Sequence, residues 1–389
     1  MKVNKTLTAL IASAGLGLSS HAFAAFTAPG TQTAAGTTIG NQVSLDYSVN
    51  GIDQDNIDSA VVNFIVDTRV DFAVELNESA TVKATPKGTG YVSTFALANY
   101  SNEALDFSFA ATNLANGSFS FLAGTETDNF DITTLAVYIE EGSNSGYQAL
   151  EDTATSINDL ATYANAGDEV TVYVVVESNI PSTGTDKDVA GVQLAATALQ
   201  GDGSAIPDQM DDANLINTKQ FVFADASNDG VETLNTAFEV SSAKFTHIDP
   251  DDGVTVVPGP GLVVVVVDDE FCNGTYTAGG GVATCDGTIT DYKPKGIPGA
   301  MVEYTITATN TGSLTANSVV FVQNLSTLSD TLAVTADLVS GSLANVTAKV
   351  NSTDIAAGDI SIVGDELTVT AGDVAINDTV TITFTAIVE

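Results

Sequence analysis

Hydrophobic and polar residues alternate with a period of two along much of the chain. Residues 43–49 read VSLDYSV, residues 302–309 read VEYTITAT, and the last segment, 380–388, reads VTITFTAIV. Successive side chains of a strand point to opposite faces, so this period puts the apolar residues of each segment on one face. Each segment therefore predicts a half-buried strand of an antiparallel sheet.

Clusters of Gly, Asn and Asp separate the strand-like segments, as the turns of an antiparallel sandwich require. Residues 37–67 predict a strand pair with a polar turn at Asn50-Gly51. Only residues 150–166 (LEDTATSINDLATYANA) have a weakly helical pattern. The pattern as a whole predicts an all-β protein.

An internal repeat suggests that one domain is used twice. Residues 91–99 (YVSTFALAN) match residues 301–310 (MVEYTITATN), and Asn310 follows Asn99 by 211 residues. The pentapeptide that begins at Asp168 (DEVTV) matches the one that begins at Asp378 (DTVTI), 210 residues later. Any two strands rich in Thr and Val look alike, but the nearly constant offset favours a tandem repeat.

These observations divide the chain into five parts. We predict a signal peptide at 1–24, an N-terminal strand segment at 25–70, and antiparallel β-sandwich domains at 71–200 and 254–389. The region 201–253 between the sandwiches is rich in Asp, Asn, Gly and Ser, which is typical of a linker or insertion.

The N-terminus predicts export. Lys2 and Lys5 precede a short apolar stretch at 6–17, and Ala22-Phe23-Ala24 has small residues where signal peptidase requires them. The alternative, a membrane anchor, needs roughly 20 apolar residues, and the stretch is too short. No later segment is long enough to cross a bilayer as a helix. We expect a protein that is not transmembrane and that is located outside the cell, on its surface or in the periplasm.

The charge excludes two classes of partner. The chain has 49 acidic and 11 basic residues, a formal net charge of −38. A field of this sign repels nucleic acid and anionic membranes, so neither is an expected partner, and it attracts divalent cations. High charge can indicate disorder, but 44% hydrophobic residues favour a folded core.

The only cysteines are Cys272 and Cys285, on either side of a glycine-rich run. In an exported chain such a pair predicts one disulfide, and two unpaired thiols are the alternative. No further cysteine or histidine set is available for a zinc site of the usual kind.

Two segments resemble a known family. PGAMVEYTITATNTG, at 298–312, resembles the signature of the bacterial surface repeat called Domain of Unknown Function eleven. AGTTIGNQVSLDYSVNG, at 35–51, is similar to the N-terminal part of long proteins that carry this repeat. The resemblance implies immunoglobulin-like sandwiches in cell-surface or secreted proteins, and it brings no catalytic residues with it.

Catalytic chemistry has little support. His247 is the one histidine left after signal cleavage, no GxSxG elbow is present, and there is no tryptophan for a sugar platform. Paired carboxylates of the glycosidase type remain an alternative, but no pair is singled out among the many acids. We therefore predict that the protein is not an enzyme.

No cofactor is indicated with certainty, and calcium is the candidate. Residues 141–152 fit the twelve-position EF-hand frame loosely, with Gly146 at the turn. The ligands would be Glu141, Ser143, Ser145 and Asp152. A second acidic turn contains Asp53, Asp55 and Asp58. A solvated polar loop is the simpler interpretation of residues 141–152.

The sequence thus predicts an exported, non-catalytic structural or adhesive protein that acts through sandwich surfaces or strand edges and forms fibres. Its partners would be copies of itself, other surface proteins or glycans. The alternative is an extracellular calcium- or carbohydrate-binding module. Residues 262–267 (LVVVVV) fit either an exposed edge strand that pairs with another chain or, more simply, an inner strand of the second sandwich.

Overall fold

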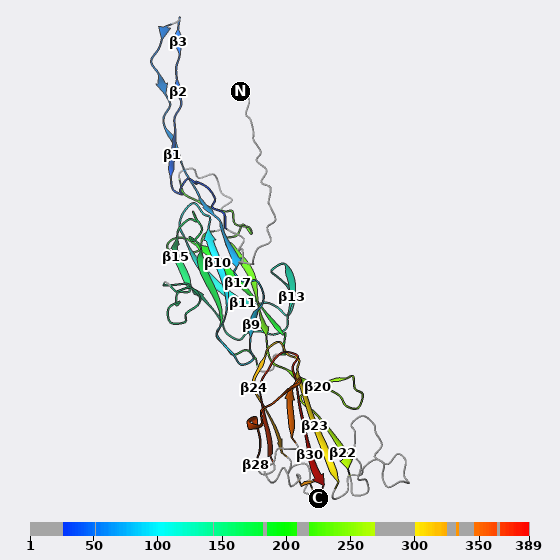
Figure 1. The fold of residues 1–389 in the computed structure, drawn as a ribbon. Coiled ribbons are helices and arrows are strands. Elements are labelled where there is room, and N and C mark those ends of the chain that lie inside the picture. Colours follow the sequence, from blue (N-terminus) through cyan, green and yellow to red (C-terminus); the bar gives the residue numbers. More distant parts are fainter. Residues whose placement is uncertain are drawn as a thin grey trace. The chain divides into compact units, whose positions relative to one another are not determined.

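The computed structural model describes residues 26–50, 52–142, 144–181, 185–207, 218–268, 300–324, 332–333, 346–363 and 366–388. Within these ranges the chain is almost wholly strand and turn, with one 3-10 turn, η1 (Ala357–Asp359). The predicted all-β class is confirmed (Figure 1). The predicted signal peptide at 1–24 and both cysteines, Cys272 and Cys285, lie outside the described residues.

The chain divides into two compact units. Unit 1 consists of Met1–Val82, Gly90–Ser178 and Ala190–Ala237. Unit 2 consists of Lys83–Thr89, Asn179–Val189 and Phe238–Glu389.

Most of the strands of a four-stranded and a seven-stranded sheet belong to unit 1. The first has the order β14 (Leu135–Ile139), β16 (Val170–Val176), β10 (Tyr91–Asn99), β8 (Phe72–Leu76). The second has the order β12 (Gly117–Phe121), β13 (Gly124–Asp128), β17 (Val189–Leu199), β11 (Leu105–Asn113), β15 (Ser156–Leu160). Outside this order, β17 also pairs with β19 (Val231–Val240), and β19 pairs with β9 (Val82–Ala84). Rings from the two sheets meet where Phe72 lies edge-on to Phe107, at 5.1 Å between centroids. Two sheets that bury their apolar faces against each other form a sandwich.

Unit 2 is a second pair of sheets around its own core. The larger sheet has the order β21 (Val256–Pro258), β20 (Phe245–Ile248), β23 (Met301–Asn310), β30 (Thr379–Val388), β26 (Thr347–Val350), β27 (Thr353–Asp354), with β22 (Gly261–Asp268) on β23 and β25 (Leu332–Ala333) on β30. The smaller has the order β24 (Ala316–Asn324), β29 (Glu366–Val374), β28 (Ile360–Val363). Leu367 and Val369 of the smaller sheet belong to the same buried cluster as Ile382 and Phe384 of the larger.

The two units repeat one strand register. In unit 1, β10 and β16 place Ser93 opposite Val174. In unit 2, β23 and β30 place Tyr304 opposite Phe384. The second pair is displaced from the first by 211 residues on one strand and 210 on the other, which are the offsets found in the sequence. Val174 and Phe384 therefore occupy equivalent, fully buried positions.

Two local expectations differ from the structure. The weak helix at 150–166 is wrong, because this segment contains β15, whose Ile157 and Leu160 are buried next to β11. Residues 201–253, interpreted as a linker or insertion, contain β18 (Phe221–Phe223), β19 and β20. Within β19 the residues 236–238 are fully buried, since this strand extends the sheet of β17. The residues on either side of β19 are polar and most of its buried residues are small, so the sequence pattern did not indicate this strand.

Candidate functional site

The candidate site is a long β-hairpin of unit 1, which we call the arm (residues 38–65; labelled β1 to β3 in Figure 1). It is a ladder of three short strand pairs, β1 (Thr38–Asn41) with β6 (Val62–Ile65), β2 (Ser44–Leu45) with β5 (Ile57–Asp58), and β3 (Ser48–Val49) with β4 (Ile52–Asp53). Asn50 has a φ of 53°, the left-handed conformation that a tight Asn-Gly hairpin turn uses. The predicted N-terminal strand pair is therefore present.

Every described residue of the arm from position 40 to position 64 is exposed. The expectation that residues 43–49 form a half-buried strand is wrong, because no second sheet among the described residues covers the two-stranded ribbon. The apolar side chains, 39–71% exposed, are Val43, Leu45, Tyr47, Val49, Ile52, Ile57, Val61, Val62 and Phe64.

The cross-strand pairs in the outer part of the arm, β2 with β5 and β3 with β4, are sorted by polarity, whereas β1 and β6 also contain the mixed pairs Thr38–Ile65 and Asn41–Val62. Leu45 lies opposite Ile57, and Val49 lies opposite Ile52. Ser44 lies opposite Asp58 and donates a hydrogen bond to its carboxylate at 2.5 Å. Directly opposite residues of an antiparallel pair share a face. Apolar and polar pairs therefore alternate along the outer part of the ribbon, which there presents apolar surface on one side and polar, acidic surface on the other.

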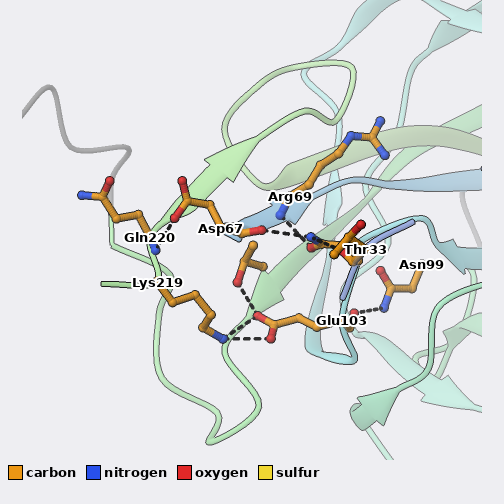
Figure 2. Close-up of polar contacts among 9 residues, drawn as sticks. Thr33, Asp67, Arg69, Asn99, Glu103, Lys219 and Gln220 are labelled. Carbon is orange, nitrogen blue, oxygen red and sulfur yellow. Dashed lines mark hydrogen bonds and ion pairs between the residues drawn. The ribbon is translucent and has the colours of Figure 1, made fainter. Parts of the chain in front are cut away.

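The base of the arm is held by the loop that follows β10 (Figure 2). The side-chain amide of Asn102 donates hydrogen bonds to the carbonyl oxygens of Thr33 (3.2 Å) and Asp67 (2.9 Å). Its oxygen accepts from the backbone N–H of Arg69 at 2.9 Å. One side chain thereby joins the segment that leads into the arm to the segment that leaves it.

Glu103, in the same loop, adds a second tie. Its carboxylate receives the Lys219 ammonium at 2.9 and 2.8 Å and the hydroxyl of buried Thr68 (Figure 2). Beside this pair, the backbone N–H of Gln220 donates to the Asp67 carboxylate at 2.9 Å, and β18 runs parallel to β7 (Thr68–Val70). We call these contacts the arm base. No local sequence signal predicts them, because Glu103 and Lys219 are 116 residues apart.

The predicted calcium ligands are only partly brought together. The Asp152 carboxylate is buried and accepts hydrogen bonds from the backbone N–H groups of Glu141 (2.8 Å) and Gln148 (2.5 Å). Backbone N–H groups of Thr153 and Ala154 donate to Glu141 and hold the pKa of its carboxyl below the ordinary value.

Of the other two predicted ligands, the carbonyl of Ser145 accepts from Gln148 at 3.2 Å, and Ser143 lies outside the described residues. The two carboxylates of this loop thus face backbone donors, and the calcium site at 141–152 stays a prediction.

The other candidates have structural partners. Asp53 and Asp58 lie on the polar side of the arm, opposite serines. His247, on β20, places Nδ1 3.0 Å from the carbonyl oxygen of Gly259, so it ties β20 to the residue that follows β21. In the part of the chain that the structure describes, no three His, Cys, Asp or Glu side chains are placed to hold a metal ion, and no helix could cross a membrane.

The comparisons with known proteins are sparse. No family model matches the chain. No curated protein matches it either. One of the similar solved structures is the major pilin subunit BcpA of Bacillus cereus, at 10% identity over 72% of this chain, with a TM-score of 0.19. The match spans 59% of that subunit. A score this low does not indicate a common fold, so no functional conclusion follows from it. The resemblance to the repeat family stays a prediction.

Proposed function

We propose that the chain is an exported, non-catalytic structural subunit whose arm docks on a second copy of the same chain. The observation that carries this proposal is the exposed apolar side of the arm. An isolated two-stranded hairpin is at best marginally stable in water, so a ribbon of this length needs a surface against its apolar side. A contiguous apolar patch exposed on a folded protein marks an interaction site.

The arm offers enough apolar surface for a specific contact. Its nine apolar side chains are 39–71% exposed. Full burial of one Val, Leu, Ile or Phe side chain contributes about 1.5–3 kcal/mol. Half-exposed, nine of them supply surface on the order of the roughly 800 Å² per partner that a standard interface buries.

A second copy is the partner because the chain carries a matching acceptor in unit 2. Among the described strands β22 pairs only with β23, and its Leu262 and Val264 are 41% and 51% exposed. An apolar strand with a free edge is a template for an added strand.

Charge favours the same contact. The formal net charge of −38 makes copies repel one another wherever acidic surfaces meet. Residues 261–267 contain no charged side chain, and the apolar pairs of the arm contain none either. An arm laid along β22 is therefore a neutral contact between two acidic molecules.

Such a contact joins two different surfaces. Each copy provides one arm and one acceptor edge, so the contact is heterologous, and unless it closes a ring it continues into an open fibre. We infer a fibre-forming surface protein. The arm base would transmit load from the arm into the sandwich of unit 1.

The test compares the full chain with charge variants, using light scattering and electron microscopy. The wild type is expected to form fibres. Leu45→Lys with Ile57→Lys puts two lysines on the apolar side and should leave monomers. The matched control, Ser44→Lys with Ser48→Lys, puts two lysines on the polar side and should still assemble. Equal assembly by both double variants, or monomeric wild type, would overturn the proposal.

Mixing distinguishes arm-to-edge from arm-to-arm contacts. Val264→Lys blocks the acceptor edge and leaves the arm intact. Mixed with the Leu45→Lys, Ile57→Lys variant, it should form dimers and nothing longer. If Val264→Lys alone dimerises, the arms bind each other and β22 is not the acceptor.

A further inference from the structure

The segment 225–232, which follows β18 and ends with the first two residues of β19, gathers oxygen atoms around one hydroxyl group. Its sequence is DASNDGVE. The Ser227 hydroxyl oxygen lies 2.9 Å from Asp225 Oδ2, 2.7 Å from Asp229 Oδ1 and 2.6 Å from the carbonyl oxygen of Val231. Three acceptors thus surround a group that has a single hydrogen.

These acceptors outnumber the donors. A hydroxyl can donate to one acceptor at a time, so two of the three contacts to Ser227 lack a proton at any moment. Backbone N–H groups add one bond to each carboxylate, from Gly230 to Asp225 at 3.2 Å and from Val231 to Asp229 at 2.9 Å. The oxygen–oxygen contacts that lack a hydrogen are repulsive. A cation at the centre would be attracted by the lone pairs of all these oxygen atoms and would remove this repulsion.

A second observation is independent of these bonds. Asp225 is 3% exposed, and its Oδ1 atom is buried without a hydrogen-bond partner. A buried carboxylate oxygen with no donor is costly, and a bound cation is one of the few ways to satisfy it. Oδ1 belongs to the same carboxylate as Oδ2, which faces Ser227, so the unsatisfied atom and this contact belong to one buried group.

Negative charge is concentrated around this carboxylate. Glu232 ends the same segment, and its Oε1 accepts from the backbone N–H of Ala226 at 2.9 Å. Asp71 lies close enough for its charge to interact with that of Asp225, and Arg69 is paired with Asp71. Arg69 thus offsets only part of the local charge.

We propose that Asp225, Ser227, Asp229 and the carbonyl of Val231 bind one calcium ion. They occupy positions 1, 3, 5 and 7 of the calcium-loop frame, and Gly230 takes the glycine position. Gly230 has a φ of 73°, and a Cβ there would lie 2.6 Å from the Phe223 ring, so a larger residue would be strained at this position.

The donor set also explains the choice of ion. It contains two carboxylates, a hydroxyl and a carbonyl, which agrees with the finding that no three acidic, His or Cys side chains of the described residues share a metal position. An all-oxygen set suits a hard cation, with water completing the six to eight ligands of calcium. With only two carboxylates we expect an affinity of about 10⁻⁴–10⁻³ M, the range of extracellular modules.

Calcium here would strengthen unit 1 close to the arm base. The carbonyl of Gly230 accepts from the N–H of Ala198 on β17 at 2.9 Å, which ties the loop to the main sheet. The loop begins directly after β18, the strand that follows Lys219.

The test is the melting temperature of the full chain in CaCl₂, with NaCl and MgCl₂ at equal ionic strength as controls. Calcium at ten times its Kd should raise the wild-type Tm by about 3–5 °C. Titration calorimetry should detect one calcium per chain that Asp225→Asn removes. A Tm that follows ionic strength alone in every salt would overturn the site.

Variants distinguish a ligand from a structural residue. Asp229→Asn and the milder Ser227→Ala should abolish or weaken the calcium response even where their Tm without calcium is close to wild type. Asp202→Asn is the matched control, because exposed Asp202 also accepts a bond from a serine two residues on, Ser204, and its loss should leave the response unchanged. If Asp152→Asn abolishes the response and Asp229→Asn does not, calcium binds at 141–152 and this proposal fails. None of these results depends on fibre formation.

Discussion

The loops that follow β10 in unit 1 and β23 in unit 2 begin at the same buried corner and then serve different purposes. Asn99 donates to the carbonyls of Leu160 (2.7 Å) and Glu103 (3.1 Å), and its oxygen accepts from the N–H of Ser101 (2.9 Å). This pattern bonds the end of β10 to its own loop and to the end of β15. The asparagine is 1% exposed.

Asn310 reproduces the pattern in unit 2. It donates to the carbonyls of Val374 (3.0 Å) and Leu314 (2.8 Å) and accepts from the N–H of Gly312 (3.1 Å). Each bond has its counterpart in unit 1. The asparagine corner is therefore part of the repeated fold.

The residues between the corner and the next strand differ. In unit 1 they include Asn102 and Glu103, which hold the arm base. In unit 2 they include Gly312, which lies so close to the backbone of residues 242–244 that an added Cβ would collide with it, and Ser313, which donates to Asp186 at 2.5 Å. A repeated corner thus supports an arm in one unit and a close backbone contact in the other.

The largest expected effect concerns the equivalent core positions Val174 and Phe384. Phe384→Ala should destabilise unit 2 by about 3–5 kcal/mol, because it removes a buried ring stacked 4.9 Å from Tyr304. Val174→Ala should destabilise unit 1 by only about 1–2 kcal/mol, since less volume is lost. Calorimetric unfolding of the full chain measures both. Equal losses would mean that the two positions are not packed as described.

Removing either corner asparagine should have similar effects on the two units. Asn99→Ala and Asn310→Ala each remove a buried hydrogen bond to a carbonyl, that of Leu160 or that of Val374, and should each cost about 1–3 kcal/mol. Urea denaturation measures the loss in the free energy of unfolding. Hydrogen exchange in the arm should rise for Asn99→Ala alone, and a rise for Asn310→Ala would show that the corners are not independent.

A smaller effect is expected at the arm base. Glu103→Gln weakens the pair with Lys219, whose side chains are 24% and 37% exposed, and should lower unit 1 stability by about 0.5–1 kcal/mol. Arm amides should exchange faster while unit 2 amides keep the wild-type rate. Lys83→Gln, which removes the ion pair with Glu239, is the matched control and should leave the arm unchanged.

The smallest effect is a difference in pH response. Burial alone would raise the pKa of Asp186, but hydrogen bonds from Ser313 and Ser242 outweigh it and leave this pKa below the ordinary value of 3.8. The stabilisation by Asp186 is thus present above pH 3.8 and is lost as the pH falls through the lower folded value.

Burial raises the pKa of Glu78 and Asp71 in unit 1, so their protonation in mild acid favours the folded state. Lowering the pH into the range where these raised pKa values are reached should therefore stabilise unit 1 slightly, and the Asp186 contribution stays intact as long as the pH is above 3.8. Calorimetry at a series of pH values, with Asp186→Asn and Glu78→Gln, follows the two responses separately. Identical pH profiles for these two variants would contradict the assignment.

Some of the candidate sites could have been found in the sequence. The D-x-S-x-D-G frame at 225–230 is visible there, but the polar composition around it is equally typical of a linker. The arm was expected as a strand pair from its alternation and its Asn50-Gly51 turn. The arm base was not expected, because Asn102, Glu103 and Lys219 acquire a role only when distant segments meet.

The sequence by itself determined the all-β class, the hairpin turn of the arm and the repeated register of β10–β16 and β23–β30. These follow from local backbone geometry, in which a period of two assigns each side chain to a face and an offset of 210–211 carries that assignment from one unit to the other. Only the tertiary structure decided which apolar faces are covered. Residues 43–49 and 302–309 alternate alike, yet the first are exposed while Val302 and Tyr304 are buried. Alternation indicates that a strand has an apolar face. Whether that face is buried depends on whether a second sheet, distant in sequence, packs against it.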